Sequence, residues 1–155
     1  MEAFDRIFVV LHNVQSPNRV VEMAKIVYGL GFPNFIVTKA VGSAAQIGVP
    51  EAQKIALKHG YNFVFLRDLS DLLEVLEPKT VLMFTPKIPE SSPFEPEEVR
   101  RKAERGEKVA LVFGGLEPGL TKRELELGKP VHLMEEASSS VLASVAIALY
   151  LIKTH

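Results

Sequence analysis

The sequence predicts a single α/β domain, residues 1–155, built on a mainly parallel β-sheet with helices on both faces. Two observations support this fold class. Short β-rich runs alternate with helical patterns along the whole chain, as in proteins made of successive strand–helix units. Several of these runs are apolar throughout, which is typical of strands in a sheet that is covered on both faces.

Six runs rich in β-branched and aromatic residues are predicted to be strands. They are Ile7 to Leu11, Asn34 to Thr38, Asn62 to Leu66, Thr80 to Phe84, Lys108 to Phe113 and Pro130 to Leu133.

Helices are predicted between these strands from apolar periodicity together with start and stop signals. Proline opens three of them, and Thr121 with Glu124 has the spacing of a capping box. Asp68 or Ser70 is expected to cap another short helix. The expected helices are Pro17 to Gly29, Pro50 to Lys58, a short one ending at Leu76, Pro96 to Arg105, Lys122 to Leu127 and Val141 to Ile152.

Composition excludes several classes of function. The formal net charge of −1 gives no overall attraction to nucleic acid, so any contact with RNA must be local. Without cysteine, the chain has no thiolate nucleophile and no cysteine-ligated metal site, and the four histidines and the carboxylates show no metal-site spacing. No signal peptide is recognisable, and the apolar run Val141 to Ile152 is shorter than the roughly 20 residues that cross a membrane. We therefore expect a cytoplasmic protein without a membrane partner or a metal.

The candidate chemistry centres on Gly114, Gly115 and Gly119, which follow a buried strand. Residues without side chains allow a ligand to approach the backbone closely, but a plain turn uses glycine for the same conformational freedom. The segment GGLEPG lacks the lysine and threonine of a phosphate-binding P-loop. The glycines alone therefore leave a turn and a ligand pocket as alternatives.

Three motifs in order resemble the SpoU-like branch of the SPOUT (α/β-knot) RNA methyltransferases, of which the chain would be a divergent member. Pro17, Lys25 and Gly31 keep the frame of the first motif. The strand end Val112 to Gly114 with Gly119 and Leu120 matches the second. Met134, Ser140, Val145 and Ala146 keep the register of the third.

This resemblance implies a C-terminal trefoil knot, a homodimer and bound S-adenosylmethionine. It further implies methyl transfer to RNA, at a ribose 2′-hydroxyl of tRNA or rRNA, without a separate RNA-binding domain. The positions that it implies for cofactor binding are Thr85, Gly114, Gly115, Gly119, His132, Leu133, Met134, Ser140 and Leu142.

Departures from the family pattern fall on the residues that would touch substrate. Lys25 occupies an arginine position, and Arg19 stands where the family has an asparagine. Leu116 replaces a glutamate and Leu142 replaces an asparagine. Lysine lacks the planar two-donor fork of arginine. Together with Arg19 and Asn18, Lys25 is nevertheless the candidate for the catalytic group near the first strand.

Two alternatives therefore stand beside the methyltransferase. One is a SPOUT-fold protein that binds RNA or the cofactor without methyl transfer. The other is an unrelated nucleotide-binding α/β hydrolase or nuclease, which we expect to need an acidic metal cluster that the sequence does not display.

Overall fold

The computed structural model describes residues 2–116, 119–133 and 140–155. Within these residues it contains a seven-stranded sheet of strand order β3-β2-β1-β6-β4-β7-β5. The strands are β1 (Ile7–Val14), β2 (Asn34–Ala40), β3 (Asn62–Leu66), β4 (Thr80–Phe84), β5 (Ser92–Pro93), β6 (Val109–Gly114) and β7 (Lys129–His132). Every neighbouring pair runs parallel, which confirms the predicted fold class.

The helices begin and end close to where the sequence places them. They are α1 (Pro17–Gly29), α2 (Val49–His59), α3 (Leu69–Leu76), α4 (Pro96–Glu104), α5 (Lys122–Leu125) and α6 (Val141–Thr154). Asp68 caps α3 and Thr121 caps α5, each in a complete capping box. Gly60 ends α2 in the left-handed conformation, with φ 72°. Helix α5 is shorter than predicted.

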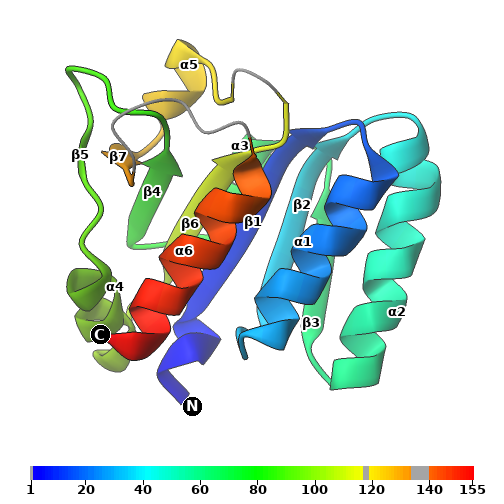
Figure 1. Cartoon of the computed structure of the whole chain (residues 1–155), viewed down its shortest axis with the longest axis horizontal. Helices are drawn as coiled ribbons and strands as arrows, with labels where there is room; N and C mark the ends of the chain where they lie inside the picture. Colours follow the sequence, from blue (N-terminus) through cyan, green and yellow to red (C-terminus); the bar gives the residue numbers. More distant parts are fainter. Residues whose placement is uncertain (1, 117–118, 134–139) are drawn as a thin grey trace.

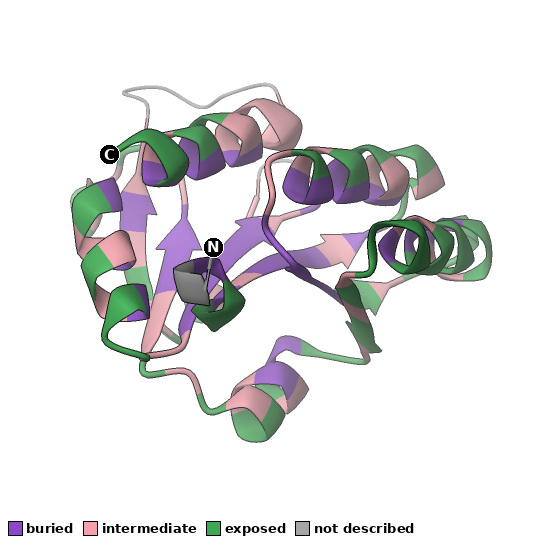
Figure 2. Cartoon of the chain, turned by 90° about the horizontal axis from the view of Figure 1, so that it is seen from below, coloured by how far each residue is buried: buried purple, intermediate pink, exposed green. Residues whose placement is uncertain are grey.

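Helices cover the two faces of the sheet unequally, as the view along the strands shows (Figure 2). The larger core cluster joins the sheet to residues of α1, α2, α4 and α6, and a smaller one joins its opposite face to α3 and α5. The central strands β1 and β6 are almost entirely buried. Each large apolar side chain buried there contributes roughly 1.5–3 kcal/mol, so these two strands form the centre of the fold.

Three short segments were not anticipated from the sequence. Glu2–Arg6 form a 3-10 helix, and Ala44–Gly48 form a π-helical turn that leads directly into α2. The third is β5, which lies in the proline-rich stretch Thr85 to Pro93 and pairs with the end of β7. This stretch is therefore an edge of the sheet rather than only a connecting loop.

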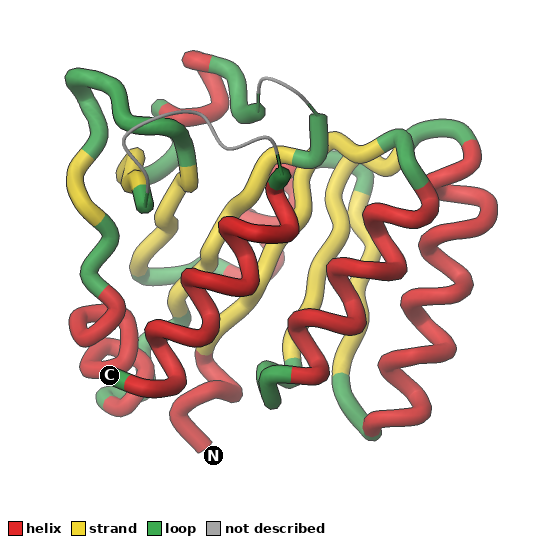
Figure 3. Tube along the Cα trace, in the orientation of Figure 1, coloured by secondary structure: helices red, strands yellow, loops and turns green. Residues whose placement is uncertain are grey.

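All strands run parallel, so their carboxyl ends meet at one edge of the sheet (Figure 1). Both chain termini lie toward the opposite edge (Figure 3). Ligands of open parallel sheets bind outside the carboxyl ends of the strands. None of the helices in the described part of the chain is long and apolar enough to cross a membrane.

We expect Gly128→Ala to lower the free energy of unfolding by about 1–3 kcal/mol. A Cβ atom at this position would lie 2.6 Å from the carbonyl oxygen of Val81 and 2.8 Å from its Cγ1, so the start of β7 would have to shift. Urea denaturation measures the change. Gly29→Ala is the matched control, because nothing lies within 4 Å of its added Cβ; an equal loss in both variants would contradict the packing argument.

Candidate functional site at the carboxyl ends of the strands

Five positions at one level of the sheet form what we call the strand-end row. His12 pairs in register with Thr38 on one side and Gly114 on the other. Met83 pairs with Val112, so two residues further along each strand Thr85 lies beside Gly114. Phe84 pairs with Val131, so one residue further along Thr85 also lies beside His132. The row thus crosses five adjacent strands, in the order Thr38, His12, Gly114, Thr85 and His132.

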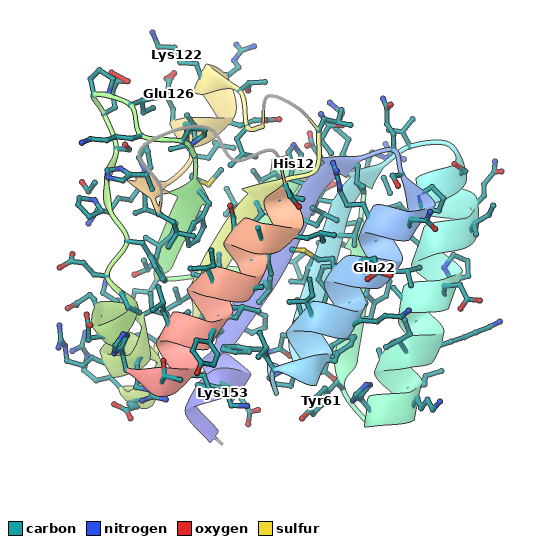
Figure 4. The ribbon with its side chains drawn as sticks, in the orientation of Figure 1. His12, Glu22, Tyr61, Lys122, Glu126 and Lys153 are labelled. Atoms are coloured by element: carbon teal, nitrogen blue, oxygen red, sulfur yellow. The ribbon has the colours of Figure 1, made fainter. Side chains whose placement is uncertain are left out.

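The His12 side chain connects three elements at the edge of the sheet. Its ring is 1% exposed, with Nδ1 2.8 Å from Thr38 Oγ1 on β2 and Nε2 2.8 Å from Glu124 Oε2 on α5. A carboxylate only accepts, so Nε2–H donates to Glu124, while Nδ1 shares a second hydrogen bond with the threonine hydroxyl. With both nitrogens engaged and the ring buried, His12 anchors α5 over the strand ends. Figure 4 shows His12 at this edge of the sheet.

Glu124 is the partner that sequence reasoning missed. Besides meeting His12, it accepts a hydrogen bond from the Thr121 N–H at 2.8 Å through Oε1. Burial of the carboxyl group acts to raise the pKa of Glu124, but the hydrogen bonds from Thr121 and His12 outweigh burial and lower it. The capping-box spacing was a visible signal for Glu124, whereas its contact with His12 spans 112 positions.

In the glycine turn that follows β6, Gly114 and Gly115 pack closely against the backbone of neighbouring residues. A Cβ at Gly115 would lie 2.6 Å from the Asn13 carbonyl oxygen, and one at Gly114 would lie 2.8 Å from the Leu120 nitrogen. The Gly115 N–H donates to the His12 carbonyl at 2.8 Å and is therefore already engaged. Gly119 differs, because it has φ 116° and open space around its Cβ position. The first two glycines are thus required by the fold of the turn itself.

Around Thr85 and His132, the chain between β4 and β5 lies against β7. The Thr85 N–H donates to the Val131 carbonyl at 2.9 Å, and Ser91 Oγ lies 2.7 Å from His132 Nδ1. The Phe94 N–H donates to the His132 carbonyl. These contacts fix the position of the predicted cofactor residues Thr85 and His132.

The remaining predicted cofactor residues lie along the same edge where they are described. Leu133 and Leu142 are partly buried and pack against the larger core cluster. Ser140 is the N-cap of α6. Met134 lies outside the described residues.

Of the predicted catalytic group, the structure brings Arg19 to the site but not Lys25. Arg19 Nη1 donates to the Gly115 carbonyl at 2.8 Å and so joins α1 to the glycine turn. Asn18 is exposed in the first turn of α1. The Lys25 side chain is 60% exposed and its Nζ lies 3.8 Å from Glu22 Oε1, and Glu22 lies partway along α1, away from the strand ends (Figure 4). The catalytic roles of these residues stay predictions.

A protein-family model described as "RecB-family nuclease (DUF2122)" matches residues 42–151. The chain belongs to this family. Two curated relatives carry names of the same kind. "Putative type II restriction enzyme MjaORF1200P" of Methanocaldococcus jannaschii is 37% identical over 94% of both chains. "Putative type II restriction enzyme ApeKORF2002P" of Aeropyrum pernix is 40% identical over 91% of this chain and 88% of that protein.

Solved structures of other proteins share the fold of this chain at low sequence identity. A "putative methylase family protein" from Neisseria gonorrhoeae superposes over 100% of this chain and 84% of its own, with TM-score 0.80 and 17% identity. The TrmH/SpoU tRNA modifying enzyme of A. aeolicus superposes over 98% of this chain and 78% of its own, with TM-score 0.67 and 18% identity. An AdoMet-bound rRNA methyltransferase from Sinorhizobium meliloti superposes over 97% and 56%, with TM-score 0.70 and 12% identity.

These findings divide the expectations drawn from the resemblance. The fold of the SPOUT methyltransferases is confirmed, whereas membership of the SpoU-like branch and the trefoil knot stay predictions. The expected function, S-adenosylmethionine-dependent methylation of RNA, is wrong. It is contradicted by the family and by the two relatives, which are described as nucleases or restriction enzymes. Those descriptions agree with the nuclease alternative that the sequence left open.

We expect Glu124→Gln to destabilise the protein at neutral pH by ~1 kcal/mol, a value reduced for the partial exposure of the carboxylate. Folding lowers the pKa of Glu124. The stability that the ionised carboxylate contributes is therefore fully present above the pKa that Glu124 has in the unfolded chain. It is lost as the pH falls through the lower pKa that Glu124 has in the folded chain. The difference from the natural protein should therefore vanish in acid. Urea denaturation at a series of pH values measures it.

Glu126→Gln on the exposed end of the same helix is the control and should show no such pH dependence. A Glu124→Gln variant whose stability matched the natural protein at neutral pH would contradict the anchoring role of the His12–Glu124 pair.

Proposed function

We propose that this protein binds S-adenosylmethionine, or a related adenosyl nucleoside, at the strand-end row and contacts RNA along the same edge. The observation that carries the proposal is the juxtaposition of Thr85, Gly114 and His132 at the ends of three adjacent strands. These were chosen from sequence as cofactor positions although they are 29 and 18 residues apart in the chain. The proposed function is binding and includes no methyl transfer.

The residues at the strand-end row have the chemical character that binding of an adenosyl group requires. A purine ring needs apolar walls and a few backbone or side-chain polar groups. Leu133 and Leu142 offer apolar surface, and Gly119 leaves space where a side chain would project. His132 adds a ring whose Nδ1 is already fixed by Ser91. S-adenosylmethionine itself carries a methyl group on a sulfonium centre, and these residues would hold and enclose it.

RNA is proposed as the partner because two fold neighbours are a tRNA modifying enzyme and an rRNA methyltransferase. Lys39 and Arg123 lie exposed near the carboxyl ends of the strands, where phosphate groups could contact them. Arg19 lies at the same edge, with its Nη1 donating to the Gly115 carbonyl. Glu124 lies on the same helix as Arg123, and Glu126 is the C-cap of that helix. Recognition is therefore expected to be local, and whether tRNA or rRNA is bound is a part of the proposal to be tested.

Cleavage of a phosphodiester bond is a second candidate, because the family and both curated relatives carry nuclease descriptions. Among residues 2–116, 119–133 and 140–155, no group of three or more His, Asp or Glu side chains is arranged to hold a metal ion. We assign no residue of this chain to a cleavage step.

S-adenosylmethionine binding should be detected by isothermal titration calorimetry and should weaken roughly tenfold or more in Thr85→Arg. The arginine would fill space between the ends of β4, β6 and β7 and repel the sulfonium cation. Thr80→Arg, at the opposite end of β4, is the matched control and should bind as the natural protein does. Absence of binding by the natural protein would overturn the proposal, as would equal weakening in both variants with the fold intact.

Incubation with supercoiled plasmid DNA and with bulk RNA tests the second candidate. Nuclease activity predicts nicked or shortened products that increase with time and protein concentration. Parallel reactions with Mg²⁺, with Mn²⁺ and with a chelator show whether cleavage needs a metal ion. Intact substrates under all three conditions, with a protein that still binds S-adenosylmethionine, would leave binding as the supported function and remove cleavage.

A further inference from the structure

The two edges of the sheet differ in their protection against pairing with another chain. At one edge, β5 has only two residues, and one of them is Pro93. At the other edge, β3 has five residues, Asn62–Leu66, with neither a proline nor a charge. Folded proteins usually blunt an edge strand by shortening it, by proline or by charge. Edge β5 has such protection and β3 has none.

Both faces of β3 are also partly bare. Val64 pairs in register with Ile36 of the smaller core cluster, and Phe65 pairs with Val37 of the larger one, so the two side chains lie on opposite faces. Val64 is 42% exposed and Phe65 is 41% exposed. Within the described part of the chain, no strand pairs with the outer edge of β3. This strand therefore presents apolar side chains and an open backbone edge together.

A cavity of about 460 Å³ lies beside this strand. Its walls come from both faces of the sheet, including Phe63 on the α2 side and Val64 on the α3 side. None of its lining residues is charged; they are Phe8, Asn34, Phe35, Ile36, Gln53, Tyr61, Asn62, Phe63, Val64, Leu66, Leu72, Val75 and Leu76. An extended strand sends alternate side chains to opposite faces, so a strand added at this edge would meet lining residues of the cavity on both faces.

We propose that β3 pairs antiparallel with β3 of a second copy of this chain, which joins the two sheets across a twofold axis. The occupant must be extended, uncharged and apolar on both faces, and the segment Tyr61 to Leu66 itself meets each condition. A twofold arrangement closes after two copies because the same surface serves as site and occupant. With Val64 at the axis, Phe63 of one copy lies opposite Phe65 of the other, and such cross-strand aromatic pairs stabilise sheets.

The competing surface for self-association is the apolar helix α6. Its exposed apolar side chains include Ile147, 40% exposed, and Tyr150, 58% exposed. Helix α6 covers the sheet around β6, whereas β3 is the edge strand on the far side of β1 and β2 (Figure 1). The two interfaces are thus separable by single substitutions.

Sedimentation equilibrium of the full chain over a concentration series tests the proposal with the natural protein, Val64→Lys and Tyr150→Lys. Lysine at Val64 would face its own copy across the axis, so the dimer dissociation constant should rise roughly tenfold or more. Tyr150→Lys should leave it unchanged. Phe65→Lys is a second edge variant, and far-UV circular dichroism with thermal melting confirms that each variant is folded.

The proposal is overturned if the natural protein is monomeric throughout the series. It is also overturned if Tyr150→Lys dissociates the dimer while the folded β3 variants do not. Because the sedimentation experiment is run without S-adenosylmethionine, these outcomes are independent of the proposed binding function.

Discussion

Parallel pairing of β1 with β6 is the interaction on which the rest of the structure depends. It runs from Ile7 beside Val109 to His12 beside Gly114 and joins segments about a hundred residues apart. The two strands lie at the centre of the sheet, and almost all of their side chains are buried. Because the strands are parallel, this register also brings the end of β1 to the glycine turn, where His12, Gly115 and Arg19 connect β1, α1 and α5.

Local structure could be predicted well from the sequence because its signals are local. Proline at the first helical turn, the capping box of Thr121 and Glu124, and Gly60 at the end of α2 each fix a boundary through backbone chemistry. The strand order could not be predicted in this way. Nor could the pairing of Pro93 with His132, because it depends on contacts across the fold rather than on the local pattern.

The candidate site shows the same division. Thr85, Gly114 and His132 were placed by resemblance, and the structure brings them side by side. Lys25 was placed by the same resemblance, yet it lies on the exposed side of α1 beside Glu22. Glu124 was seen only as a helix cap, because its contact with His12 joins residues 112 positions apart. The resemblance therefore named positions that lie together in the structure, and tertiary structure was needed to identify their partners.

Fold and family point in different directions for function. The whole chain superposes on methyltransferases at 12–18% identity, which establishes the architecture, while relatives at 37% and 40% identity carry restriction-enzyme names. The departures at Lys25, Leu116 and Leu142 fall at motif positions of the RNA methyltransferases. An architecture that hosts several chemistries explains how both relationships can hold.

The central claim is that the carboxyl ends of β4, β6 and β7 hold an adenosyl nucleoside. Amide chemical-shift mapping of the isotope-labelled protein during titration with S-adenosylmethionine tests the claim directly. The account predicts saturable shifts clustered at Thr85, Gly114, His132 and Leu133. Shifts confined to the β3 edge, or no shifts at saturating ligand, would contradict it.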